Sequence, residues 1–173
     1  MNKIKISKIT ELSMLAGIAA AISIIDKIIS GMMFSVIPGI KIGLANVIII
    51  VSIIKYSFKD TLMVVLLKSI ITGLLFGSIS TFIIGGISSL LSFLVMYYIY
   101  KKGKHLSLIS VSIIGGFIHI NTQLLILGFI YSIGREIYIY GFLLIIISFF
   151  TSIIIGMISS KLNVIYQNNI IIK

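Results

Sequence analysis

Long apolar runs separated by short polar breaks dominate this chain. Glycine, serine, charged residues or the single proline, Pro38, mark the breaks. The apolar runs predict six helices, over 9–30, 40–56, 61–78, 81–100, 106–131 and 137–160. Because about 20 apolar residues cross the roughly 30 Å hydrocarbon core of a bilayer, we expect an all-α integral membrane bundle of six transmembrane helices. Residues 1–173 are predicted to form one domain.

Composition agrees with a membrane environment. The chain is 59% hydrophobic and 10% charged, with a mean hydropathy of +1.25, so it has too little polar surface for a water-soluble globule. Its net charge of +10 does not indicate nucleic acid binding, because the lysines flank apolar runs and form no long basic surface. The absence of cysteine excludes disulfides, thiolate chemistry and cysteine-bound metal. No cofactor or metal motif is present.

The basic residues predict the orientation. A cytoplasmic N-terminus places ten of the fourteen on the cytoplasmic side, which predicts a multi-pass cell-membrane protein with both termini in the cytoplasm. These ten are Lys3, Lys5, Lys8, Lys55, Lys59, Lys101, Lys102, Lys104, Lys161 and Lys173. The start of the chain resembles a secretory signal, but this orientation favours an uncleaved first helix.

Lys68 lies in the middle of the third predicted helix. A charged side chain at the bilayer centre costs about 2.5–3.5 kcal/mol on insertion scales unless a cavity or a partner compensates it. The alternative is a structural lysine that snorkels to the membrane surface. The central depth favours a functional role.

His119 belongs to a polar stripe on the fifth predicted helix, with Gly115, Thr122 and Gln123 at helical spacing. Such a stripe lines a ligand cavity or bonds to neighbouring helices, and the sequence leaves both interpretations open.

The segment 37–46 leads from the first external loop into the second predicted helix. It contains Pro38, Gly39, Lys41 and Asn46. A helix N-terminus there would present N–H groups to an anion, and Lys41 would add a mobile charge. An ordinary helix start with an interfacial lysine explains the spacing equally well.

The first predicted helix carries a face of small residues, Ala16, Gly17, Ala20 and Ala21. Small residues four apart allow close helix approach, either inside the bundle or against another membrane subunit.

The sequence contains few residues that could catalyse a reaction. The only acidic residues are Glu11, Asp26, Asp60 and Glu136, with no aspartate-rich magnesium motif and no nucleotide-binding motif. We therefore expect no catalysis by this chain alone.

Three stretches carry a family resemblance: IPGIKIGLANVI, LLKSIITGLLFGS and GGFIHINTQLL. They resemble the Gx transporter family, also labelled heptaprenyl diphosphate synthase component I, over roughly 11–160. The most specific element is PGIKIGLAN, at 38–46. The chain has Lys68 where the family leads us to expect arginine, and His119-Ile120-Asn121-Thr122-Gln123 where we expect His-Asn-x-Gly-Gln. Lysine lacks the bidentate geometry of arginine.

That family is similar to the S components of energy-coupling-factor transporters. These are six-helix proteins that bind a small ligand near the external side and dock through the first helix onto a transmembrane coupling subunit with two ATPases. The resemblance implies the same fold and partners here, with docking through Ala16, Gly17, Ala20 and Ala21. We expect a small ligand that is anionic or related to isoprenoids or quinones. The expected binding residues are Lys41, Asn46, Lys68, His119 and Gln123, with Pro38 and Gly39 in a gate loop.

Two other functions stay open. The synthase label implies a non-catalytic membrane subunit that accompanies a soluble prenyl diphosphate synthase subunit in making the menaquinone side chain. A scaffold within a membrane redox assembly is the third. Membrane lipid is an expected contact in every case.

Overall fold

The structure is a computed structural model that describes the chain except for residues 1–2, 34–40, 77–78, 104–105, 132–135 and 172–173. The described part consists of helices joined by short connections. Its elements are α1 (Lys3–Met33), α2 (Asn46–Lys55), α3 (Phe58–Phe76), α4 (Ile79–Lys102), α5 (Leu108–Tyr131) and α6 (Glu136–Ile171). The six predicted helices are confirmed. The predicted gate residues Pro38 and Gly39 lie outside the described residues.

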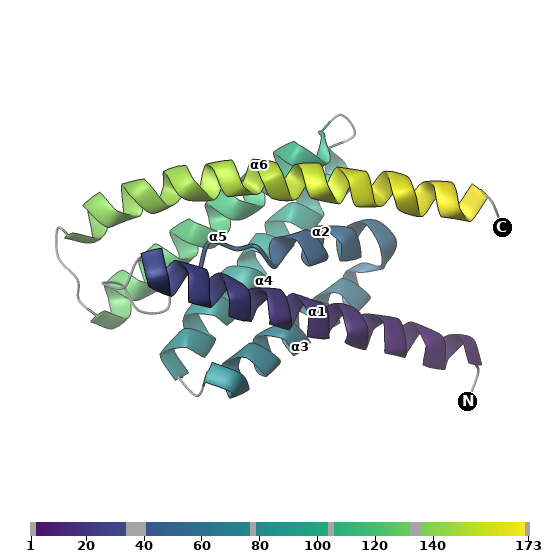
Figure 1. The fold of residues 1–173 in the computed structure, drawn as a ribbon, viewed down its shortest axis with the longest axis horizontal. Coiled ribbons are helices and arrows are strands. Elements are labelled where there is room, and N and C mark those ends of the chain that lie inside the picture. Colours follow the sequence, from purple (N-terminus) through teal and green to yellow (C-terminus); the bar gives the residue numbers. More distant parts are fainter. Residues whose placement is uncertain (1–2, 34–40, 77–78, 104–105, 132–135, 172–173) are drawn as a thin grey trace.

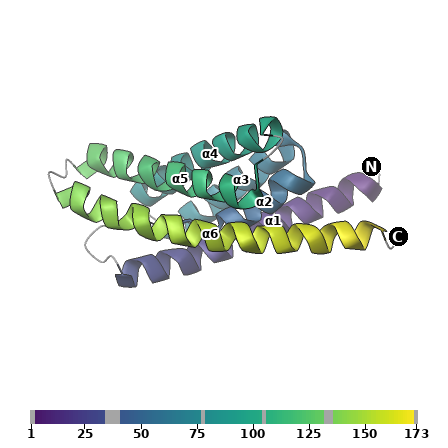
Figure 2. The same ribbon diagram turned by 90° about the horizontal axis from the view of Figure 1, so that it is seen from above.

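Five helices surround the short helix α2 (Figure 1). Contacts run from α6 to α5, α4, α3 and α1 in turn, and α2 contacts all five. In the described residues α1 and α6 do not contact each other, so the ring is open at this one place. Figure 2 shows α4 and α5 on one side of the bundle and α1 and α6 on the other. The start of α1 and the end of α6 lie at the same end (Figure 1).

Four of the described helices are long and apolar enough to cross a membrane: Ile6–Met32, Ile79–Lys102, Leu108–Ile130 and Gly141–Ile165. Many large apolar side chains face outward, with Phe129 93% exposed, and many serine side chains are buried. This distribution suits a bundle whose solvent is lipid, because hydrocarbon accepts apolar surface and the interior satisfies the polar groups.

The second predicted helix differs most from the structure. It was predicted to begin at residue 40, but α2 begins at Asn46, and 41–43 are not helical. Its 10 residues rise about 15 Å, half of the hydrocarbon thickness, so α2 does not span a bilayer alone. The sixth helix was predicted to end at residue 160, but α6 continues to Ile171, since a lysine at 161 does not interrupt a helix.

Small residues hold α5 and α6 together. The Ser112 hydroxyl donates to the Ser152 carbonyl at 2.7 Å, and the Ser148 hydroxyl donates to the Gly116 carbonyl at 3.2 Å. At Gly156 an added Cβ would lie 2.6 Å from the Ile109 Cα. Backbones this close require glycine at the contact.

Candidate functional site

The carboxylate of Asp26 organises the interior of the bundle. It lies on α1, is buried, and accepts the backbone N–H groups of Ile42 at 3.0 Å, Gly43 at 2.8 Å and Leu44 at 3.0 Å. The Ser30 hydroxyl lies 3.4 Å from the same carboxylate. Consecutive N–H groups that converge on one carboxylate form an anion-binding turn. Asp26 therefore holds the segment 41–45 inside the bundle and sets where α2 begins.

Gly43 provides the turn that this clamp requires. Its φ is +96°, a conformation that side chains disfavour. An added Cβ would lie 3.3 Å from both Asn46 Nδ2 and His119 Cδ2. Gly43 thus touches one side chain of α2 and one of α5, and it brings the start of α2 against the middle of α5.

Gln123 fixes the segment from the opposite side. Its Nε2 donates to the Lys41 carbonyl at 3.1 Å, and its Oε1 accepts the Lys41 N–H at 2.9 Å. The Gln123 amide is fully buried. The Gln123 amide thus bonds both the N–H and the carbonyl of Lys41. These two bonds fix the backbone of Lys41 and with it the point from which its side chain extends.

Two lysines are buried here. Lys41 is 6% exposed and Lys68 is 5% exposed, and the Lys68 ammonium donates to the Ser89 hydroxyl at 2.9 Å. The Lys41 ammonium lies against Gly85 of α4, 3.5 Å from the position of an added Cβ. Asp26 attracts both ammonium groups, and the two repel each other. Among the described buried residues two positive charges therefore meet one carboxylate, which favours an added anion.

Asn46 and His119 complete the cluster, and each is 3% exposed. The Ser88 backbone hydrogen-bonds the His119 ring. In the described structure Asn46 Oδ1 and His119 Nδ1 are buried without a hydrogen-bond partner. Buried polar atoms are nearly always paired in proteins, so these two are candidates for contact with a bound molecule.

The structure brings together the five residues predicted to bind a ligand: Lys41, Asn46, Lys68, His119 and Gln123. Sequence reasoning missed Asp26, Gly43 and Ser89. An aspartate within a long apolar helix is itself a signal of function, but Asp26 was considered only as one of the four acidic residues that form no magnesium motif.

A carboxylate of the protein itself binds to the segment that leads into α2. One of the two interpretations of the segment 37–46 was that its N–H groups face a bound anion; in the structure the N–H groups of 42–44 donate to Asp26. Lys41, predicted to be a mobile charge, has a buried side chain and a backbone fixed by Gln123. In the described parts of the chain, no three His, Asp or Glu side chains gather as metal ligands.

The predicted docking face divides into two parts. Ala16 and Ala20 are buried, and Ala16 packs with Val64 of α3. Gly17 and Ala21 are exposed, and an added Cβ at Gly17 would meet nothing within 4 Å. The buried alanines support the close α1–α3 contact, and the exposed pair is the part available to another subunit. Docking itself stays a prediction.

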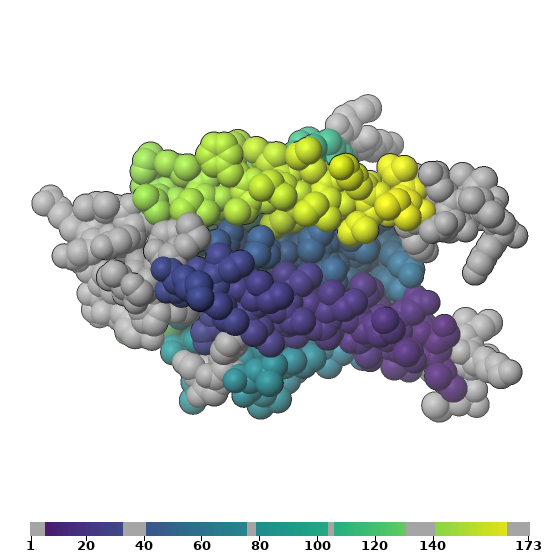
Figure 3. All heavy atoms as spheres, in the orientation of Figure 1, coloured from purple at the N-terminus to yellow at the C-terminus, as the bar shows by residue number. Residues whose placement is uncertain are grey.

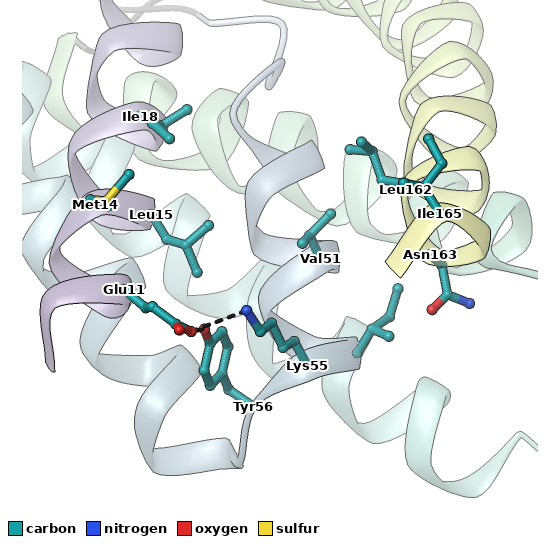
Figure 4. Close-up of a pocket in the computed structure, with 11 residues that line it drawn as sticks. Glu11, Met14, Leu15, Ile18, Val51, Lys55, Tyr56, Leu162, Asn163 and Ile165 are labelled. Carbon is teal, nitrogen blue, oxygen red and sulfur yellow. Dashed lines mark hydrogen bonds and ion pairs between the residues drawn. The ribbon is translucent and has the colours of Figure 1, made fainter. Parts of the chain in front are cut away.

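A hollow lies apart from this cluster, where the ring of helices is open. It has a volume of about 360 Å³ and is bounded by α1, α2 and α6. Figure 3 shows α2 at the base of the gap between the other two helices. Figure 4 shows apolar side chains on its walls and Glu11, Lys55 and Tyr56 together at one end. The Lys55 ammonium is 3.0 Å from the Glu11 carboxylate, to which the Tyr56 hydroxyl also donates.

Comparison with known proteins identifies one family. The family described as heptaprenyl diphosphate synthase component I matches residues 15–162, which include every residue of the buried cluster. No curated protein and no solved structure matches the chain significantly.

Proposed function

The chain belongs to the heptaprenyl diphosphate synthase component I family, and we propose that it is a membrane-embedded subunit that binds a small anionic molecule for uptake. In this proposal it acts like the S component of an energy-coupling-factor transporter. It captures the molecule on the external side and passes it to the cytoplasm with a coupling subunit and two ATPases.

The observation that carries the proposal is the pair of buried ammonium groups at Lys41 and Lys68. Both are buried in an apolar bundle, and among the carboxylates that the structure describes Asp26 attracts both of them. Desolvated charge in a membrane protein is expensive and usually marks a substrate or ion pathway. An anion between the two lysines would be attracted by both ammonium groups.

The other residues of the cluster have separate roles in this proposal. Asn46 and His119 orient the ligand through their unpartnered polar atoms. Gln123 positions Lys41 through its two backbone bonds. The loop with Pro38 and Gly39 opens and closes the external entrance. A helix that starts within the membrane is a common way to build a transporter binding site, and α2 starts beside the two lysines.

The orientation and the docking surface belong to the same proposal. Both termini lie in the cytoplasm, in agreement with the positive-inside rule, and the start of α1 and the end of α6 lie at one end of the bundle (Figure 2). The coupling subunit docks on α1, where Gly17 and Ala21 are exposed. The chain contains no nucleotide-binding motif, so the partner ATPases supply the energy.

Native mass spectrometry of the protein purified gently from its own membrane tests this function. We expect a stoichiometric anion that is not a lipid, together with a coupling subunit and ATPases. Copurification of a soluble prenyl synthase, with no such anion, would contradict uptake.

A second candidate is a non-catalytic membrane subunit of heptaprenyl diphosphate synthase. Two observations favour it: the description of the family, and the apolar hollow between α1 and α6, whose walls suit a hydrocarbon chain. In that case the protein presents or holds the growing prenyl chain at the membrane for a soluble catalytic subunit. Copurification with that subunit distinguishes this candidate from uptake.

A further inference from the structure

One turn of α4 holds the two buried ammonium groups. The Lys41 ammonium lies against Gly85, and the Lys68 ammonium donates to the Ser89 hydroxyl at 2.9 Å. Because Gly85 and Ser89 are one helical turn apart, they lie on the same face of α4, about 6 Å from each other along the axis. A carboxylate bonds an ammonium group at about 2.8 Å, so one carboxylate between the two lysines can bond both.

The same turn leaves open space beside Lys41. A Cβ added at Gly85 would lie 3.5 Å from Lys41 Nζ, and apart from the neighbouring backbone of α4 no other described atom lies within 4 Å of it. At Gly86 the added Cβ would meet the Ser69 Cβ, at 3.9 Å. Gly85 is only half-buried, so this space is not sealed from the surface. An oxygen atom of a ligand therefore has room beside the Lys41 ammonium.

The buried charges favour a ligand with a single negative charge. Lys41 and Lys68 contribute two positive charges and Asp26 one negative charge. Lys27 also repels Lys41, but its side chain is partly exposed and its charge is screened. One added negative charge balances the buried groups, and a second would be uncompensated in an apolar bundle. A carboxylate carries one charge at neutral pH, whereas a phosphate monoester carries about 1.5–2.

The two unpartnered atoms of the cluster are both hydrogen-bond acceptors. His119 Nδ1 has no partner in the described structure, so the ring bonds the Ser88 backbone through Nε2. The Ser88 N–H is bonded within α4, so its carbonyl accepts and Nε2 carries the hydrogen. Lys41 and Lys68 repel a third positive charge, which keeps the ring neutral and makes Nδ1 an acceptor. Asn46 Oδ1 also accepts, and both atoms need an O–H or N–H donor.

We infer that this site takes a monocarboxylate that carries its own O–H or N–H groups. Its carboxylate lies beside Gly85 and bonds the Lys41 and Lys68 ammonium groups, and its O–H or N–H groups donate to Asn46 Oδ1 and His119 Nδ1. The inference rests on the proposed uptake function and narrows its ligand. Phosphate esters and dicarboxylates have too much charge for the site, and an unsubstituted hydrocarbon acid leaves both acceptors unpaired.

Three acids with three carbons each test the ligand class. Glycerate has one carboxylate and two hydroxyl groups, propionate lacks the hydroxyl groups, and malonate has a second carboxylate. Each is titrated into the full-length protein in detergent at constant ionic strength, and the thermal stability is measured. Glycerate should stabilise the wild type at a concentration roughly tenfold lower than propionate or malonate does, because two buried acceptors gain donors. Equal potency of glycerate and propionate, as expected if water fills the acceptors, would overturn the inference, as would a preference for malonate or no stabilisation by glycerate.

Two alanine variants of α4 test where the carboxylate lies. Gly85→Ala fills the space beside the Lys41 ammonium at an ordinary contact distance, so it should fold and should weaken glycerate binding roughly tenfold. Gly86→Ala is the matched control, because its Cβ points to Ser69 and should leave glycerate binding unchanged. Binding by Gly85→Ala as tight as that of the wild type, or equal losses in both variants, would overturn this placement. The comparison of the three acids on the wild type does not depend on how the variants fold.

The ligand released from the native protein separates this inference from the uptake function. Mass spectrometry in H₂O and in D₂O should find one acidic group and at least one exchangeable hydrogen in the anion. A copurified coupling subunit together with a released phosphate ester, dicarboxylate or acid without exchangeable hydrogen would overturn the inference and leave uptake intact. A preference for glycerate in a protein that copurifies with a prenyl synthase would support the site and overturn uptake.

Discussion

Replacing Asp26 with asparagine should destabilise the protein more than any other single change of charge that we propose. Its Oδ2 accepts the N–H groups of Gly43 at 2.8 Å and Leu44 at 3.0 Å, and its Oδ1 accepts that of Ile42. Asparagine keeps one oxygen but places an NH₂ group where the second oxygen accepts two hydrogen bonds. It also removes the carboxylate that attracts Lys41 and Lys68.

The magnitude follows from these contacts. Two hydrogen bonds to a charged group, each contributing about 1.5–3 kcal/mol, amount to roughly 3–6 kcal/mol. Breaking a buried charge pair by removal of one partner costs about 3–5 kcal/mol, in agreement. For a chain of 150–250 residues 1 kcal/mol shifts Tm by about 2–4 °C, so Asp26→Asn should lower Tm by roughly 10 °C.

The assay is the fraction of protein that remains monodisperse on size-exclusion chromatography after heating in detergent. Asp60→Asn is the matched control, because Asp60 pairs at 2.8 Å with Lys8, whose side chain is half exposed. An exposed pair contributes less than about 1 kcal/mol. A Tm of Asp26→Asn within about 2 °C of the wild type, or equal to that of Asp60→Asn, would refute the role assigned to the buried carboxylate.

Three further predictions follow. Gly43→Ala should lower the free energy of unfolding by about 1–2 kcal/mol, because the φ of Gly43 is +96°. Gly17→Ala is the control: a Cβ added at Gly17 meets nothing within 4 Å, so thermal stability should change little. Gly156→Ala should cost about 1–3 kcal/mol by forcing α5 and α6 apart, and a Tm equal to that of Gly17→Ala would contradict this contact. Contact with Lys8 holds the pKa of Asp60 below its ordinary 3.8, so its stabilisation is present above that pH and is lost as pH falls through the lowered pKa. Thermal unfolding of the wild type and of Asp60→Asn is measured between about pH 5 and about pH 3. The difference between their Tm values should shrink as the pH falls. A difference that grows toward low pH would contradict this prediction.

The helices were predictable because lipid imposes a simple rule. Apolar runs of membrane length form helices, and glycine, proline and charge mark their ends. The burial of Lys68 and His119 followed from the same rule, since each lies in the middle of an apolar run. The depth of a residue in the membrane can be predicted from its position within a single apolar segment.

The contacts that build the site were not predictable from local pattern. Asp26 bonds the N–H groups of residues 16 to 18 positions away, and Gln123 bonds Lys41 across 82 positions. These pairs depend on how the helices pack, which hydrophobic periodicity does not specify. The late start of α2 was missed for the same reason: the apolar residues of 40–44 suggest helix, but Asp26 accepts their N–H groups.

The most direct test of the central claim compares the ligand carried by three proteins purified from native membranes: the wild type, Lys68→Met and Lys59→Met. Lys59 is exposed on α3 and controls for the loss of one positive charge. Native mass spectrometry should find the same stoichiometric anion, not a lipid, on the wild type and on Lys59→Met, and should find it lost from Lys68→Met at an unchanged elution volume. Retention of that anion by Lys68→Met, or its absence from the wild type, would contradict the account.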